Sequence, residues 1–165
     1  SAIVAYLEEL FPTPSLQPAT AQGRALMNQW ISAVNSYYYP YMIYHVGHER
    51  NVFPALGIPS DEKVVAHALP KITVGFQVLQ RQLSHGEGFL LGGEVGLADY
   101  YLLPCTFSFN RTPEGKAMYA DFPAVRDWRE RMEALPSVQR FRAAQPPIVP
   151  IEHARKWAVS HRPKY

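Results

Sequence analysis

Apolar residues recur every three or four positions through most of this 165-residue chain, which is the spacing of one face of a helix. The pattern predicts six helices, over residues 2–10, 21–47, 60–83, 97–109, 123–135 and 138–144. No segment shows a convincing strand pattern, and no internal repeat is present. The sequence therefore predicts an all-α fold, a helical bundle of five or six helices.

Polar residues and prolines mark the expected ends of these helices. Thr20, Ser60 and Ser137 precede three of the apolar patterns and are predicted to be N-caps. Pro40 falls inside the longest pattern, so that helix should be kinked or divided there. Residues 51–59 contain two prolines and a glycine and are predicted to form a loop.

Prolines also set the expected domain boundaries. Residues 11–18 hold three prolines, which disfavour helix and indicate an extended link. More prolines follow the last predicted helix. We expect residues 1–18 to be a helix plus linker, residues 19–145 the helical domain and residues 146–165 a tail. The helix over residues 2–10 has no N-terminal cap, which favours a fragment of a longer protein.

The stretch FLLGGEVGLADYY, residues 89–101, predicts the start of a central helix. Gly96 occupies the N-cap position, and Asp99 falls three residues later. In a capping box, an acid at that position accepts a hydrogen bond from the N-cap backbone and favours the positive end of the helix dipole. Gly96 has no side-chain acceptor, so half of the box remains. Asp99 is therefore predicted to be a buried structural acid.

The second half of the longest predicted helix carries a cluster of aromatic residues: Tyr37, Tyr38, Tyr41, Tyr44 and His45. Residues three or four apart share a helix face, so the cluster covers two adjoining faces. Tyrosine combines a large apolar ring with a hydroxyl, which suits a partly wet hydrophobic pocket. Packing in the core or at an interface between subunits is the equal alternative.

Composition and charge narrow the class of protein. The chain is 47% hydrophobic and 13% aromatic, which argues against disorder. A net charge of +2 is too small to favour nucleic acid or an anionic membrane as partner. No apolar run approaches the ~20 residues of a membrane-spanning helix. The single cysteine, Cys105, excludes an internal disulfide and suits a reducing cytosol.

Other candidate sites have weaker support. His45, His48 and Glu49 have helical spacing that lets them converge, but a metal site would need further ligands from another element, so none is expected. Cys105 lies in an apolar helix and is expected to be an inert, buried thiol. The basic tail around Trp157 is expected to dock on the bundle, either as a lid over a pocket or simply as a terminus.

Three segments resemble glutathione S-transferases. A glycine-flanked Phe-Leu, a short loop and then x-Ala-Asp opening an apolar helix, as in residues 89–101, is similar to the helical C-terminal domain of that family. Gly96 departs from the family's common Ser or Thr. Residues 2–9 resemble the end of the third helix of the family's thioredoxin-like N-terminal domain. PSVQRF, residues 136–141, resembles the end pattern of the family.

The resemblance implies a cytoplasmic, homodimeric glutathione transferase. Glutathione and a catalytic Cys, Ser or Tyr would belong to a thioredoxin-like domain ahead of Ser1, so this chain would hold no catalytic residue and no metal and would be inactive alone. Its helices would supply the pocket for a hydrophobic electrophile and part of the dimer interface. The implied pocket residues are Tyr37, Tyr38, Tyr41, Tyr44, His45 and Trp157.

The resemblance is compatible with transferase, peroxidase, isomerase or dehalogenase-like activity. A second hypothesis belongs to another class of protein. Helical domains of this kind also serve as non-catalytic modules for dimerisation or protein interaction.

Overall fold

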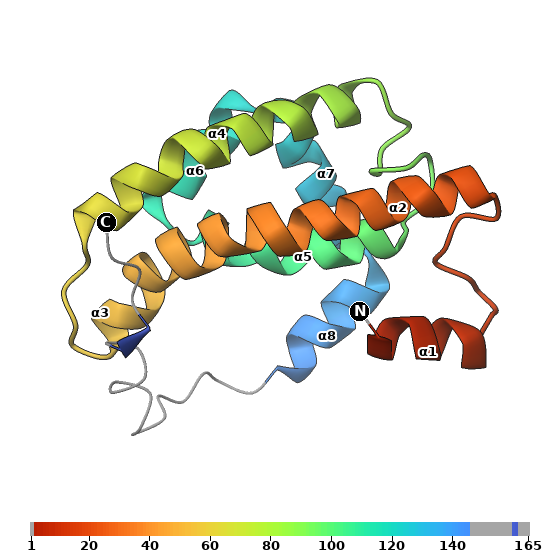
Figure 1. The fold of residues 1–165 in the computed structure, drawn as a ribbon, viewed down its shortest axis with the longest axis horizontal. Coiled ribbons are helices and arrows are strands. Elements are labelled where there is room, and N and C mark those ends of the chain that lie inside the picture. Colours follow the sequence, from red (N-terminus) through yellow and green to blue (C-terminus); the bar gives the residue numbers. More distant parts are fainter. Residues whose placement is uncertain (1, 146–159, 162–165) are drawn as a thin grey trace.

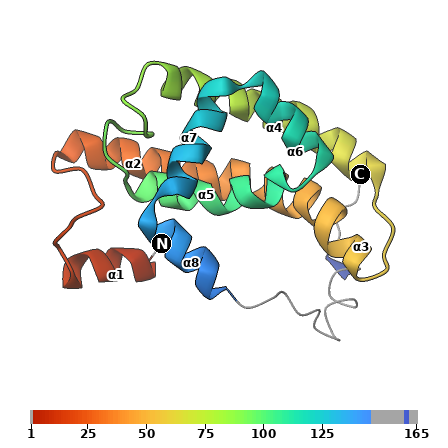
Figure 2. The same ribbon diagram turned by 180° about the vertical axis from the view of Figure 1, so that it is seen from behind.

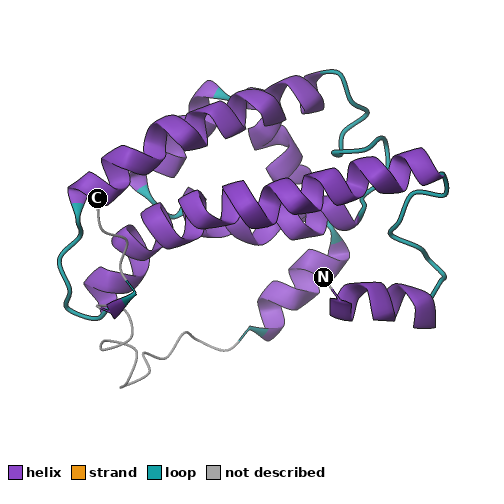
Figure 3. Ribbon diagram, in the orientation of Figure 1, coloured by secondary structure: helices purple, strands orange, loops and turns teal. Residues whose placement is uncertain are grey.

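The computed structural model describes residues 2–145 and 160–161 of the chain. These residues are helical, apart from loops and an isolated bridge between Phe89 and Gly92, which confirms the predicted all-α fold (Figures 1 and 3). The elements are α1 (Ala2–Leu10), α2 (Ala21–Ala33), η1 (Val34–Tyr38), η2 (Pro40–Val52), α3 (Phe53–Ala55), α4 (Glu62–Ser84), α5 (Leu97–Asn110), α6 (Pro113–Asp121), α7 (Pro123–Ala134) and α8 (Pro136–Ala144).

The elements α2, η1, η2 and α3 follow one another as a single long helical body (Figure 1). Thr20 caps it as predicted, because its side chain accepts a hydrogen bond from the Gly23 N–H. The body was expected to be kinked or divided at Pro40 and to end near Gly47. It continues instead to Ala55, with π-type turns on both sides of Pro40. The wider turn accommodates a residue that lacks a backbone N–H.

Gly47 brings this helical body close to α5. A Cβ atom at Gly47 would lie 2.6 Å from Ser108 Oγ, so the absence of a side chain permits the close approach of the two helices. Residues 51–59 were predicted to form a loop, but the first half of this segment, up to Ala55, is helical. Phe53 in this segment is buried and packs against Ile58. Within the described residues, no helix combines the length and the hydrophobicity needed to cross a membrane.

The central helix is α5, which contacts α2, η2, α6 and α7. In the view from behind, α5 lies in front of the long helical body and runs along it (Figure 2). Its buried residues cover most of its circumference, as expected of a helix inside a bundle: Leu97, Ala98, Asp99, Leu102, Leu103, Cys105, Thr106 and Phe109.

Asp99 joins three parts of the bundle at the start of α5. Its carboxylate accepts hydrogen bonds from the backbone N–H of Gly96 and of Leu90, both at 3.0 Å, and from Trp128 Nε1 at 2.7 Å. The side chain is 1% exposed. Burial raises the pKa of this carboxyl, and the three donors act in the opposite direction. The prediction of a buried structural acid with half of a capping box is confirmed.

Two other predicted caps were wrong. The N-cap of α4 is Asp61, whose carboxylate accepts a hydrogen bond from the Lys63 N–H. The Ser60 hydroxyl does not cap the helix, since it donates to the Glu49 carbonyl. Ser137 lies inside α8, which starts after Leu135 without a side-chain cap. Its hydroxyl pairs with that of Tyr100 at 2.9 Å.

The described residues contain seven helical bodies, one more than the upper end of the prediction. The additional helix is α6. Its N-terminal signal is ordinary: the Thr112 hydroxyl accepts a hydrogen bond from Gly115 N at 3.0 Å, and Pro113 occupies the first helical position. α6 packs between α5 and α7.

The first helix, α1, stands at the edge of the bundle (Figures 1 and 2) and contains no buried residue. The linker that follows it is tied to α5, since the Leu97 N–H donates to the Leu16 carbonyl at 3.0 Å. The large apolar side chains of α1 and its end are exposed, with Ile3 at 76% and Phe11 at 66%. This surface lacks a partner among the described residues.

Candidate functional site

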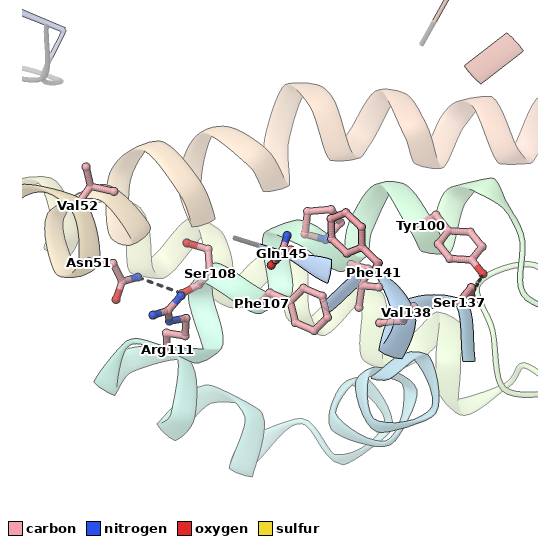
Figure 4. Close-up of a pocket in the computed structure, with 12 residues that line it drawn as sticks. Asn51, Val52, Tyr100, Phe107, Ser108, Arg111, Ser137, Val138, Phe141 and Gln145 are labelled. Carbon is pink, nitrogen blue, oxygen red and sulfur yellow. Dashed lines mark hydrogen bonds between the residues drawn. The ribbon is translucent and has the colours of Figure 1, made fainter. Parts of the chain in front are cut away.

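A groove of about 620 Å³ lies between η2, α5 and α8 (Figure 4). α8 follows α7 and is held to α5 by the hydrogen bond between the hydroxyls of Ser137 and Tyr100. The wall is mainly apolar and carries side chains from all three elements: Val52, Leu103, Pro104, Phe107, Val138 and Phe141. A concave, mostly apolar site with a few polar groups is typical of a small-molecule binding site.

The apolar end of the groove is formed by α5 and α8. Val138 is buried, whereas Phe141 is 61% exposed and presents its ring to the groove. The paired hydroxyls of Tyr100 and Ser137 close this end (Figure 4). Phe141 thus offers ring surface that the fold itself does not bury.

The other end of the groove is polar. Asn51 donates a hydrogen bond to the Ser108 carbonyl at 3.2 Å, which holds η2 against α5. Arg111 lies beside this pair, just after the end of α5 (Figure 4). The groove therefore has an apolar body and one cationic end.

The structure places Tyr37 and Tyr38 against α4, away from the groove. The Tyr37 hydroxyl donates to the Lys71 carbonyl at 2.8 Å, and the Tyr38 hydroxyl donates to the Gly75 carbonyl at 3.0 Å. Burial is the main cause that raises the pKa of both phenols. Neither residue lines the groove. Their surroundings are those of packing between two helices, the alternative that the sequence left open.

Tyr41 and His45 continue this contact along η2. The Tyr41 ring lies 5.2 Å from that of Tyr37 and 5.1 Å from that of His45, and Lys71 Nζ lies 5.7 Å from the centre of the Tyr41 ring. His45 is buried and donates through Nδ1 to the Pro40 carbonyl. These side chains gather beside α4 and not at the groove.

Tyr44 does not line the groove; it is exposed and packs against other aromatic rings of the long helical body. Its ring contacts those of Tyr39 and His48, at 5.2 and 5.0 Å. Tyr44, His48 and Val52 follow at four-residue intervals, and Val52 lines the groove. Trp157, the remaining predicted pocket residue, lies outside the described part of the chain.

Glu49 has a structural role. Its side chain is fully buried, and Oε2 accepts a hydrogen bond from the Asp61 N–H at 2.7 Å, which ties η2 to the start of α4. Among the described residues, no group of three side chains of the kinds that ligate metals is placed to share an ion. The hypothesis of a metal site at His45, His48 and Glu49 therefore gains no support.

Cys105 is buried in α5, as predicted. Burial raises the pKa of its thiol to about 12, so the thiol is protonated at neutral pH. Since the thiolate is the nucleophile, this cysteine is unsuited to covalent catalysis.

Comparison with known proteins assigns the class of domain. Residues 27–136 match the family model of the glutathione S-transferase C-terminal domain. The chain belongs to this family.

Individual relatives point to the same family. A probable glutathione S-transferase of Oryza sativa subsp. japonica, GSTF1, is 31% identical over 133 residues, which are 80% of this chain and 59% of that relative. Glutathione S-transferase 1 of Dianthus caryophyllus is 38% identical over 104 residues, 62% of this chain and 45% of that relative. The chain thus spans between 45% and 59% of the length of these two relatives.

A solved structure supports the same fold. Glutathione S-transferase III in its apo form superposes with a TM-score of 0.72 at 28% sequence identity, covering 82% of this chain and 61% of that one.

Proposed function

We propose that this chain is the helical part of a glutathione transferase and that the groove between η2, α5 and α8 holds the hydrophobic electrophile. The observation that carries the proposal is the apolar groove itself, found in a member of this family and lined by an exposed aromatic residue, Phe141. Tyr44, which precedes Val52 by two turns, would extend the wall along η2.

The chemistry would be attack by the thiolate of glutathione on the bound electrophile. Sulfur forms a bond to the electrophilic carbon, and either a leaving group departs with its electron pair or, in an addition, a proton is taken up. The apolar walls position the electrophile and exclude water, which strengthens electrostatic interactions around the developing charge. Cys105 is not a candidate for this chemistry, because its thiol is buried and protonated.

By resemblance to the family, glutathione and the group that lowers its thiol pKa would belong to a thioredoxin-like domain. The exposed apolar surface of α1, with Ile3, Tyr6 and Leu7, fits burial against such a domain. The coverage of the relatives is consistent with additional sequence of comparable size. We propose that α1 is the last helix of that domain and that residues 11–18 link it to the bundle.

We also propose a cytoplasmic homodimer that associates through the face shared by η1, η2 and α4. Tyr37 and Tyr41 lie on this face beside Lys71, and Val74 and Val78 on α4 are 53% and 37% exposed. Changing Val74 and Val78 together to glutamate should convert the dimer into a monomer, because two pairs of like charges would be buried at the interface. Light scattering after size exclusion measures this. A wild-type protein that is monomeric at tens of micromolar would contradict the proposal.

The activity is tested on the full-length gene product that contains this chain. We expect it to conjugate glutathione with a chlorodinitrobenzene, and we expect the 165-residue chain alone to be inactive and to bind glutathione weakly. If the intact protein shows neither conjugation nor glutathione binding, the chain is better explained as a non-catalytic interaction module.

A further inference from the structure

A second hollow of about 330 Å³ adjoins the polar end of the groove, between α5, α7 and α8. The two hollows share Phe107, Arg111 and Gln145, so they lie next to each other. Charged side chains dominate the second one. It is lined by three arginines and one glutamate, which leaves an excess of two positive charges: Arg111, Arg129, Arg142 and Glu133.

The single glutamate is already engaged. Glu133 accepts a hydrogen bond from Arg129 Nη1 at 2.6 Å, and its other oxygen lies 3.6 Å from Arg142 Nη1. Arg129 Nε is buried and has no hydrogen-bond acceptor among the described residues. Glu133 therefore neutralises only part of the cluster, and donors of the arginines remain available to an anion.

Arg111 lines both hollows, and Arg142 lines the second one. The Arg142 guanidinium lies 4.7 Å from the centre of the Phe107 ring, and Phe107 belongs to both hollows. Arg111 forms no ion pair with any carboxylate in the described ranges 2–145 and 160–161. Guanidinium groups suit this position because they stack on aromatic faces and bind carboxylates through two parallel hydrogen bonds.

From this arrangement we infer that the two hollows form one amphipathic site, whose ligand is an apolar molecule carrying a carboxylate. The apolar body lies against Phe107 and Phe141, and the carboxylate lies between Arg111 and Arg142. The inference rests on the proposed function and names its substrate class: an apolar organic acid in preference to a neutral compound of the same shape. Arg111 and Arg142 are then the specificity-determining residues.

The test compares two probes with the same ring system, naphthoate and its neutral amide, naphthamide. Binding of each to the full-length protein that contains this chain is measured by isothermal titration calorimetry. Wild type should bind naphthoate about tenfold more tightly than naphthamide, as expected for a charge-assisted hydrogen bond to the carboxylate. Arg111→Gln and Arg142→Gln should each remove most of this preference while leaving naphthamide binding unchanged.

Arg140→Gln is the matched control. Arg140 lies on α8 and is exposed, it lines neither hollow, and its replacement removes the same charge. It should leave the preference within about twofold of wild type. Circular dichroism of each variant confirms that it is folded.

The outcomes separate this inference from the proposed function. Equal binding of the two probes to wild type, or an equal loss of naphthoate binding in the Arg111, Arg142 and Arg140 variants, overturns the carboxylate site and leaves the groove intact. If neither probe binds, or if Phe141→Ala leaves both affinities unchanged, the groove is not the binding site and the proposed function fails as well.

Discussion

Replacing Asp99 by alanine is expected to lower the free energy of unfolding by about 3–5 kcal/mol. The substitution leaves the N–H groups of Leu90, Gly96 and Trp128 without their acceptor in a buried site. Each unsatisfied buried donor costs about 1–3 kcal/mol, and relief from burying a carboxylate offsets part of the sum. Guanidinium unfolding followed by far-UV circular dichroism measures the change.

Two variants control this experiment. Asp121→Ala removes an exposed acid at the end of α6 and should change stability by less than about 0.5 kcal/mol. Asp99→Asn keeps one acceptor oxygen but turns an amide N–H group toward another donor, so its loss should be intermediate. An Asp99→Ala protein as stable as Asp121→Ala would show that this carboxylate does not organise the bundle.

The pH dependence of the same residue has a definite sign. Burial raises the pKa of Asp99 in the folded state, so the folded protein binds this proton more tightly than the unfolded chain. Its contribution to stability is therefore largest below the unfolded pKa of about 3.9 and declines as pH rises toward the folded pKa. Asp99→Asn should lack this component of the pH profile.

Gly115→Ala is expected to have the second-largest effect, a loss of about 3 kcal/mol. A Cβ atom there would lie 1.9 Å from the carbonyl oxygen of Phe109 and 2.6 Å from its carbonyl carbon, both backbone atoms of α5. Backbone cannot rotate away as a side chain can, so α6 must shift and strain the Thr112 cap. For a chain of this size the melting temperature should fall by about 6–12 °C.

The matched control for this substitution is Gly93→Ala. The nearest atom to a Cβ at Gly93 is a carboxylate oxygen of Glu87 at 3.1 Å, on an exposed and movable side chain. Its melting temperature should stay within about 2 °C of wild type. If the two alanine variants have the same melting temperature, α6 does not pack on α5 as described.

Helix positions were largely predictable from the sequence, because a helix that buries one face carries apolar residues at intervals of three or four positions. Trp128 and Met132, one turn apart on α7, are examples, and both are buried. Asp99 was predictable because its role is local, three residues after Gly96. The missed α6 had an equally local signal, Thr112 as the N-cap followed by Pro113 at the first helical position.

The groove was not predictable in the same way, because it depends on which helix faces which. Phe107 and Phe141 are 34 positions apart in the sequence and meet only through the packing of α8 on α5. Residue type gave no better guide: a tyrosine hydroxyl suits a wet pocket, but in Tyr37 and Tyr38 it is satisfied by a carbonyl of α4. Local spacing cannot distinguish these two outcomes.

The most direct test of the groove as the electrophile site is a kinetic comparison in the full-length protein. Phe141→Ala removes a ring that lines the groove and is 61% exposed, so the fold should tolerate it. We expect KM for the chlorodinitrobenzene to rise about tenfold, with KM for glutathione within about twofold of wild type. An unchanged KM for the electrophile, or a rise confined to glutathione, would contradict the assignment.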